Sequence, residues 1–334
     1  MSRAVKNTAA SVRQRLQNLS RQRGEQFQTT MVQYGLERLM YRLSRSSWRS
    51  AFLLKGALLF VTWLKTPWRT TRDPDLLGLG GDTIPEIKQV FRGVCDVRVV
   101  DDGLEFHGDT VRAEEIREAT EYHGVRVTLM AMLGTARIPL QVDIGFGDAV
   151  TPKAERVVYP TLLDLPAPVL KAYPLTSVVS EKFETLVRFG MLNSRMKDFH
   201  DLWIIARSFR VEGAVLRDAI AATFKRRKTS VPHMAPAAFS TEFARDKVKT
   251  AQWQAFLRKN RLDGPPLVQA IALIKRFLMP VKEAISHSDS FDMMWPAGGP
   301  WKRASSHKET NRRVKSGNSP AELAPTLGKT TRIS

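Results

Sequence analysis

Hydrophobic residues recur at helical spacing near the start of the chain and at shorter spacing after it. Val12, Leu16 and Leu19, and then the run Val32–Leu43, follow steps of three or four positions, which predicts two helices within residues 8–45. From Phe52 to about Asp148 the pattern changes to short apolar runs broken by Gly, Pro and Asp, which is typical of a mixed α/β region. The predicted strands are 70–77, 95–100, 123–132 and 136–145, and the predicted helix among them is 84–92.

Helical spacing returns after a proline-containing connection at residues 152–174. From about Trp295 apolar periodicity disappears and cations dominate, which predicts a disordered tail. The predicted helices are 178–190, 194–209, 213–226, 240–258 and 266–285. The expected organisation is N-terminal helices packing on the core in 1–48, an α/β lobe in 49–150, a helical lobe in 151–290 and a disordered basic tail in 291–334.

Composition narrows the class of protein. The 334 residues are 43% hydrophobic and 25% charged, as in a soluble globular protein, and no stretch approaches the ~20 apolar residues of a membrane span. The single cysteine, Cys95, forms no intramolecular disulfide, and the N-terminus lacks the apolar segment of a signal peptide, so we expect a cytoplasmic protein. A net charge of +19 favours a polyanionic partner, above all nucleic acid, although the excess also fits a role in solubility.

Three carboxylates are candidates for metal binding. Asp73 and Asp75 stand two positions apart within a predicted strand, so both side chains point to one face. A divalent cation relieves the repulsion between two such carboxylates and can also bind the phosphates of a nucleotide. Asp143 lies on a further predicted strand, opposite the apolar face of Leu140, Val142 and Ile144. An ordinary surface turn at Asp73-Pro74-Asp75 and an ordinary exposed Asp143 are the alternatives.

Two charged residues fall on apolar stripes of the predicted helical lobe. Lys182 is in line with Val178 and Leu186, so it faces inward and requires an anionic partner, which a triphosphate would supply. A lysine that extends along the edge of the stripe is the alternative. Asp198 lies on the stripe of the next helix, where Arg195 can pair with it.

Two neighbours on that second helix are more consistent with structural roles. Asp201 follows one turn after Asp198 and can brace the fold. His200 has no nucleophile-base pattern around it, which also favours a structural role.

The order of these motifs resembles the AbiEii/AbiGii-type nucleotidyltransferase toxins, a family that includes the MenT toxins. The resemblance covers roughly residues 50–210. It rests on LLKGALLF, RTTRDPDLL, PLQVDIGFGD, EKFETLVRFG and SRMKDFHDLW.

The resemblance implies an α/β (α+β) nucleotidyltransferase lobe of the DNA polymerase β type, with a mixed sheet, plus a C-terminal helical lobe. It implies transfer of a nucleoside monophosphate from an NTP substrate, with Mg²⁺ (or Mn²⁺), to RNA, with the 3' end of tRNA as the acceptor in some relatives, and pairing with a cognate antitoxin. The catalytic residues would be Asp73, Asp75, Lys182 and Asp198; the metal ligands would be Asp73, Asp75 and Asp143; and the nucleotide-binding residues would be Lys55, Gly56 and Arg69.

The chain departs from many relatives in one motif. Gly56 is followed by Ala57 and Leu58, where relatives carry a further small residue and then a hydroxyl residue. Backbone N–H groups can still reach a phosphate at Gly56, but a side-chain hydroxyl contact is missing. The choice of nucleotide is therefore left open.

A basic run follows one predicted helix. Lys225, Arg226, Arg227 and Lys228 are candidates for binding an RNA backbone, and capping of the helix C-terminus by cations is the alternative. Two other functions are compatible with the sequence: transfer to a small-molecule or protein acceptor, and nucleic-acid binding without catalysis on the same scaffold.

Overall fold

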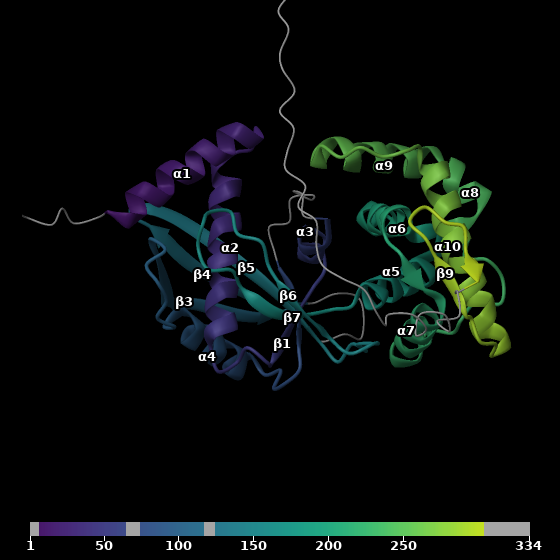
Figure 1. Cartoon of the computed structure of the whole chain (residues 1–334), viewed down its shortest axis with the longest axis horizontal. Coiled ribbons are helices and arrows are strands. Elements are labelled where there is room, and N and C mark those ends of the chain that lie inside the picture. Colours follow the sequence, from purple (N-terminus) through teal and green to yellow (C-terminus); the bar gives the residue numbers. More distant parts are fainter. Residues whose placement is uncertain (1–6, 65–73, 117–123, 304–334) are drawn as a thin grey trace, which may run out of the picture.

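The architecture comes from a computed structural model, which describes residues 7–64, 74–116 and 124–303. A seven-stranded sheet with helices against it forms one lobe, and a helical lobe lies beside it (Figure 1). The elements of the first lobe are α1 (Thr8–Arg23), α2 (Phe27–Arg45), β1 (Phe52–Lys55), α3 (Leu58–Leu64), β2 (Asp75–Gly78), α4 (Ile84–Cys95), β3 (Leu104–Glu115), β4 (Gly124–Leu133), β5 (Ala136–Phe146), β6 (Glu155–Val158) and β7 (Val169–Ala172).

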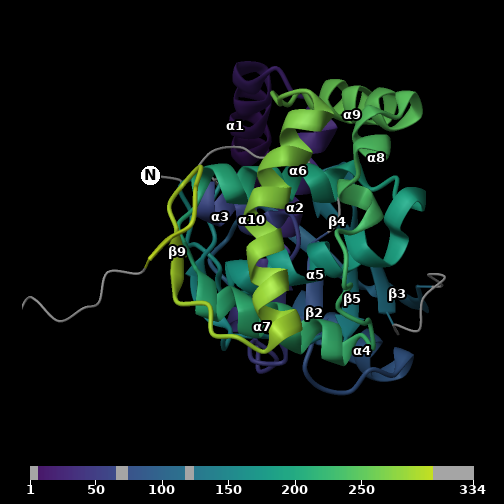
Figure 2. The same ribbon diagram turned by 90° about the vertical axis from the view of Figure 1, so that its right-hand side faces the viewer.

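The helical lobe contains five helices longer than ten residues and a small sheet. Its elements are α5 (Leu175–Phe189), α6 (Met196–Ser208), β8 (Val211–Glu212), α7 (Gly213–Arg226), α8 (Thr241–Arg245), α9 (Lys247–Asn260), α10 (Leu267–His287), β9 (Met293–Trp295) and β10 (Lys302–Arg303). Short 3-10 turns lie at Gly190–Leu192 and Ala237–Phe239. The long helix α10 packs on α6 and α7 and crosses the outer side of the lobe (Figure 2). Within the described residues, no helix has the length and hydropathy needed to cross a membrane.

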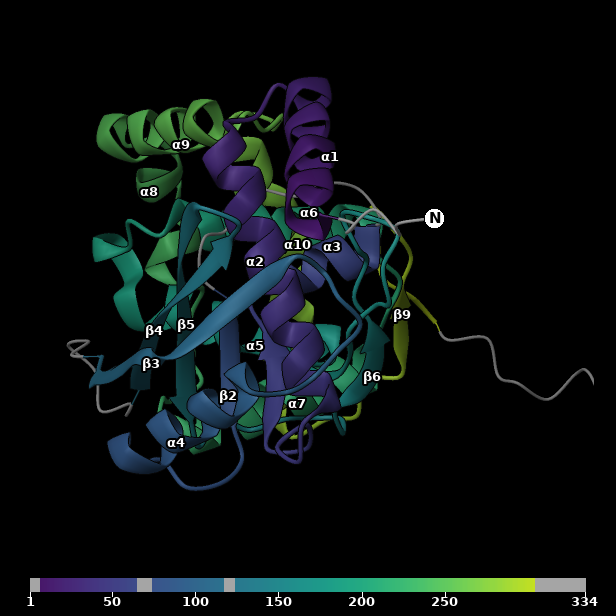
Figure 3. The same cartoon turned by 90° about the vertical axis from the view of Figure 1, so that its left-hand side faces the viewer.

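The large sheet is mixed, with the strand order β3-β4-β5-β2-β1-β7-β6. The pairs β2/β5 and β1/β7 are parallel, and the other neighbouring pairs are antiparallel. Helices α2 and α4 cover one face (Figure 3). Helix α2 approaches β5 closely because Gly35 has no side chain: a Cβ there would lie 3.0 Å from a methyl group of Leu140.

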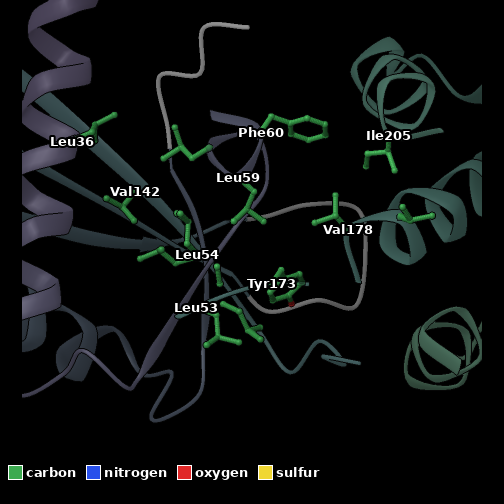
Figure 4. Close-up of a cluster of buried hydrophobic side chains, with 14 of the residues drawn as sticks. Leu36, Leu53, Leu54, Leu59, Phe60, Val142, Tyr173, Val178 and Ile205 are labelled. Atoms are coloured by element: carbon green, nitrogen blue, oxygen red, sulfur yellow. The ribbon is translucent and has the colours of Figure 1, made fainter. Parts of the chain in front are cut away.

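One hydrophobic core connects the two lobes. Leu53, Leu54 and Val142 from the sheet pack in the same cluster as Val178 and Ile205 from the helical lobe (Figure 4). Burial of this apolar surface is the main force that holds the helical lobe against the sheet. The lobes therefore form the two walls of any cleft between them.

The structure confirms the predicted mixed sheet and the predicted helices at 8–45, but it corrects several elements. Residues 95–100 form no strand, because α4 continues to Cys95 with Phe91, Val94 and Cys95 facing the core at helical spacing. The long strand β3 was missed because only Leu104 and Val111 of its side chains are buried, which leaves no apolar alternation to detect. Strands β1, β6 and β7 were also missed, and the helix predicted at 240–258 is divided into α8 and α9 at Asp246, which caps the second.

The predicted disordered tail is wrong for its first residues. Residues 291–303 form β9, β10 and the turn between them, with Trp295 almost fully buried. Trp301 stacks on Phe277 of α10, and its indole nitrogen donates a hydrogen bond of 3.0 Å to the Phe277 carbonyl. Two tryptophans separated by PAGGP have no helical or strand period, so only the tertiary contacts reveal this packing. Residues 304–334 lie outside the described part of the chain.

Candidate active site

Four charged residues form a row across the sheet. Lys55 on β1 pairs with Asp75 on β2, Asp75 with Asp143 on β5, and Asp143 with Arg126 on β4. Residues directly opposite each other on neighbouring strands point to the same face, and neighbouring strands lie ~4.8 Å apart. Strand pairing therefore places two candidate carboxylates side by side between two cations.

Gly56 allows Asp75 to occupy its position. Its φ of +73° is a conformation that L side chains rarely adopt. A Cβ built on Gly56 would lie 2.0 Å from Oδ2 of Asp75 and 2.9 Å from its Cβ, so a side chain at position 56 would displace the carboxylate of that aspartate. Gly56 thus makes room for the carboxylate at the start of β2.

The two aspartates of the row differ in their surroundings. Burial raises the pKa of Asp75, and Asp143 adds to this effect, while Lys55 and Lys197 oppose it. Asp143 accepts two hydrogen bonds of 2.9 Å from Nε and Nη2 of Arg126 and one of 3.2 Å from Gln141. Asp143 is therefore firmly oriented, whereas Asp75 gains from any additional positive charge nearby.

Helices α5 and α6 form the opposite wall, and a buried ion-pair cluster joins them. Lys182 Nζ lies 2.6 Å from Oδ1 of Asp198 and 2.8 Å from Oδ2 of Asp201, and Arg195 Nε lies 2.9 Å from Oδ2 of Asp198. Burial alone would raise the pKa of Asp198, but the charges of Lys182 and Arg195 outweigh it and hold that pKa below its ordinary value.

The inward orientation of Lys182 is confirmed. The predicted pairing of Arg195 with Asp198 is confirmed as well. The anion that Lys182 needs is supplied by the protein's own carboxylates, so a triphosphate is not required to explain its burial. Asp201 braces this cluster, as expected. His200 is buried among Trp203, Trp253 and Phe256, in agreement with a structural role.

A second network joins the sheet to α5 and α7. Asp148 lies 2.9 Å from Nζ of Lys55 and 3.1 Å from Nη2 of Arg227, and Arg227 also contacts Glu184 at 2.8 Å. Glu181 completes the network at 3.7 Å from Lys55. Burial would lower the pKa of Lys55, but Glu181 and Asp148 raise it above its ordinary value, so this lysine is fully charged.

The basic run at 225–228 is not a continuous solvent-facing patch. Arg227 is turned into the carboxylate network, and Arg226 donates a hydrogen bond to the Gly147 carbonyl at the end of β5. Lys225, Arg226 and Lys228 are exposed. Arg227 therefore connects the lobes, contrary to the prediction that it binds RNA, while RNA binding by the other three stays a prediction.

The two walls enclose a cavity of about 260 Å³. Asp75, Asp143, Lys182 and Asp198, four of the predicted site residues, line it together with the predicted Lys55 and Gly56. Asp73 and Arg69 lie outside the described residues. The structure brings these six residues together, although they come from β1, the loop after it, β2, β5, α5 and α6.

Several residues of the cavity were not predicted. Asp148, Glu181 and Lys197 line it as well. Partial burial lowers the pKa of Lys197, and the positive charge of Arg195 adds to this effect. Two signals were present in the sequence: Asp148 ends the PLQVDIGFGD motif, and Lys197 directly precedes Asp198.

The donor set fits a divalent cation in part. Carboxylate oxygens are the ligands that Mg²⁺ prefers, and Asp75 and Asp143 supply them from adjacent strands. Arg126 occupies both oxygens of Asp143, so this arginine would have to release one of them to an ion. Among residues 7–64, 74–116 and 124–303, no group of three His, Cys, Asp or Glu side chains is arranged to hold a metal.

The family of the chain follows from a sequence comparison. The model of the family described as "Nucleotidyl transferase AbiEii toxin, Type IV TA system" matches residues 38–284, which is most of the chain. The chain belongs to this family. The AbiEii match extends beyond the 50–210 region of the sequence motifs and includes the second part of α2, from residue 38, and the helical lobe as far as α10.

Solved structures with related shapes are more distant. JHP933 from Helicobacter pylori aligns with a TM-score of 0.43 at 10% identity and covers 76% of this chain and 92% of its own. A second H. pylori structure, of a "putative nucleotidyltransferase", aligns with a TM-score of 0.41 at 11% identity and covers 77% of this chain and 96% of its own. No curated protein sequence matches this AbiEii nucleotidyltransferase.

Proposed function

We propose that this AbiEii nucleotidyltransferase moves a nucleoside monophosphate from an NTP to RNA, with the 3' end of tRNA as the favoured acceptor. It would act in the cytoplasm as the toxin of a toxin–antitoxin pair. The observation that carries the proposal is the row of Lys55, Asp75, Asp143 and Arg126, which faces the cations of α5 and α6 across the cavity.

Each wall of the cavity has a separate role in this proposal. Asp75 and Asp143, with Asp73, would hold Mg²⁺ or Mn²⁺, which neutralises phosphate charge during an in-line displacement. Burial raises the pKa of Asp75, which supports this role. A bound cation would stabilise the charged form of this carboxylate, which burial disfavours. Lys182 and Asp198 would position the triphosphate, with Asp201 fixing the lysine.

Lys197 is a further candidate for the triphosphate. Lys197 lines the same cavity, and its lowered pKa means that an anionic ligand would stabilise its charged form. Lys55, by contrast, is held by Asp148 and Glu181. Lys55 would therefore contact the nucleotide only after giving up one of these carboxylates.

RNA is proposed as the acceptor because of charge. The chain carries 52 Lys and Arg against 33 Asp and Glu, and such an excess attracts polyanions and raises their rate of encounter. An antitoxin counterpart is implied by the toxin–antitoxin family itself.

Incubation with total RNA, Mg²⁺ and each α-labelled NTP in turn tests the proposal. We expect label in tRNA-sized RNA with the unmodified protein, and a loss of at least about 100-fold with Asp75→Asn, which removes a carboxylate while keeping its size. The control is Asp263→Asn, which changes an exposed aspartate outside the cavity. Addition of EDTA should abolish labelling and excess Mg²⁺ should restore it.

Three results would overturn the proposal. If the Asp75→Asn variant still labels RNA, the carboxylates of the row take no part in the reaction. If the label enters a small molecule or a protein instead, RNA is not the acceptor. RNA binding without labelling by any NTP, in Mg²⁺ or Mn²⁺, would indicate a non-catalytic binding protein.

A further inference from the structure

A second cavity lies on the sheet away from the candidate active site. It has a volume of about 610 Å³ and is lined by the start of α2 and by β3, β4 and β5. We call it the α2–β5 cavity. Its lining includes Arg112, Thr128, Met130, Arg137, Pro139 and Gln141.

The α2–β5 cavity opens on the same face of the sheet as the carboxylate row. Along β5, Arg137, Pro139, Gln141 and Asp143 alternate with buried residues, so these four point to one face. Pairing extends that face to the next strands, because Gln141 lies opposite Thr128, which lies opposite Arg112. At ~3.3 Å per residue, Pro139 is about 13 Å from Asp143 along the strand.

Gln141 links the two sites directly. Its side chain lines the α2–β5 cavity, and its amide nitrogen donates a hydrogen bond of 3.2 Å to Oδ1 of Asp143. The same oxygen accepts a hydrogen bond from Arg126. A ligand that engages Gln141 would therefore act on the orientation of Asp143.

The chemistry of the lining differs from that of the active site. In the active-site cavity Lys55, Lys182 and Arg227 are paired with carboxylates, whereas the described lining of the α2–β5 cavity contains two arginines and no Asp or Glu. Its other polar groups are amides and hydroxyls, namely Gln26, Gln28, Gln141, Thr29, Thr110 and Thr128. Its apolar groups are Val32, Leu129, Met130, Pro139 and Leu140.

This set of groups matches the parts of a nucleotide. Arginines without a carboxylate in the same lining attract phosphate, amides and hydroxyls hydrogen-bond to the edges of bases and to 2'-hydroxyls, and apolar side chains contact the base face. A stacked strand rises ~3.4 Å per nucleotide, so about four nucleotides span the distance from Asp143 to Pro139.

We propose that the α2–β5 cavity binds single-stranded RNA of the acceptor, about four nucleotides from the end that reacts, and that Gln141 transmits this binding to Asp143. The inference rests on the proposed function for the identity of the ligand. It adds a defined path for the acceptor strand over the open face of β3, β4 and β5.

Binding of a fluorescein-labelled single-stranded RNA to the full chain tests the inference without catalysis. Arg112→Gln combined with Arg137→Gln should raise Kd about tenfold, because two phosphate contacts are lost. The matched control is Arg92→Gln with Arg98→Gln, which removes the same charge from exposed positions on and just after α4, on the helix-covered face of the sheet. Equal effects of the two pairs, or no effect of the first pair, would overturn the inference.

A second measurement uses the length of the acceptor. If the unmodified protein labels RNA, kcat/KM should be about tenfold higher for a six-nucleotide acceptor than for a two-nucleotide one, and the Arg112/Arg137 variant should lose this preference while its KM for NTP is unchanged. If the Arg112/Arg137 variant still prefers the six-nucleotide acceptor, the acceptor strand does not pass through the α2–β5 cavity. If no RNA is labelled, the proposed function fails, while the binding comparison still decides whether the cavity holds RNA.

Discussion

Replacing Gly56 with alanine tests whether Asp75 must lie where the structure places it. The new Cβ would be 2.0 Å from Oδ2 of Asp75, 2.8 Å from its Cγ and 2.9 Å from its Cβ, whereas real Cβ contacts essentially never fall below 3.0 Å. The carboxylate oxygen has to move by about 1 Å to reach an ordinary contact distance, and the Asp75 Cβ contact persists whatever the rotation of the carboxylate. A misplacement of this size at a reacting centre can cost about 100-fold in rate.

The same substitution also strains the backbone. Gly56 has a φ of +73°, and an L residue in this region costs about 1–2 kcal/mol. Gly134, in the turn between β4 and β5, has a φ of +60°, but the nearest atom to its added Cβ is 3.8 Å away, on Ala9. Gly134→Ala is therefore a control that shares the strain without the clash.

We expect both variants to lose about 1–2 kcal/mol in the free energy of unfolding, measured in urea. Only Gly56→Ala should also lose about 100-fold in nucleotidyl transfer, measured with α-labelled NTP. Full activity of Gly56→Ala would show that Asp75 tolerates displacement, and an equal loss in Gly134→Ala would show that strain alone, rather than the position of Asp75, determines the rate.

Three further predictions concern stability. Burial raises the pKa of Glu37 from 4.5 to about 7. As the pH rises, the unfolded chain loses this proton before the folded protein does, so the free energy of unfolding falls by about 3 kcal/mol between pH 4.5 and 7. Glu37→Gln should abolish this pH dependence, which urea titrations at several pH values would measure. Trp301→Ala removes the stacking on Phe277 and should cost about 2 kcal/mol; an unchanged urea midpoint would contradict the packing of residues 291–303. Lys182→Met removes the ammonium group that lies 2.8 Å from the fully buried Asp201 and should cost about 3 kcal/mol. Adding Asp201→Asn should recover part of this loss, and strict additivity in the double-mutant cycle would refute the coupling.

The sequence alone determined the features that depend on neighbours along the chain. Helical spacing of apolar residues located α1, α2 and α6 closely, and alternation located β4 and β5, because each of these elements buries one regular face. The inward orientation of Lys182 and the pairing of Arg195 with Asp198 followed from positions on a single helix.

Where the sequence failed, the local signal was weak. Strand β3 buries too few side chains to alternate, and residues 291–303 are ordered by the contacts of two tryptophans with α10. Such contacts join residues that are distant in the chain, so no periodic pattern records them.

The row of Lys55, Asp75, Asp143 and Arg126 in the candidate active site is the clearest case of a feature that only the tertiary structure decided. The sequence identified Asp75 and Asp143 as candidates, but their adjacency depends on the parallel pairing of β2 with β5, and the role of Arg126 depends on the register of β4. Strand order and register are set by packing of the whole sheet against its helices, and a shift of one residue would move every one of these side chains to the opposite face.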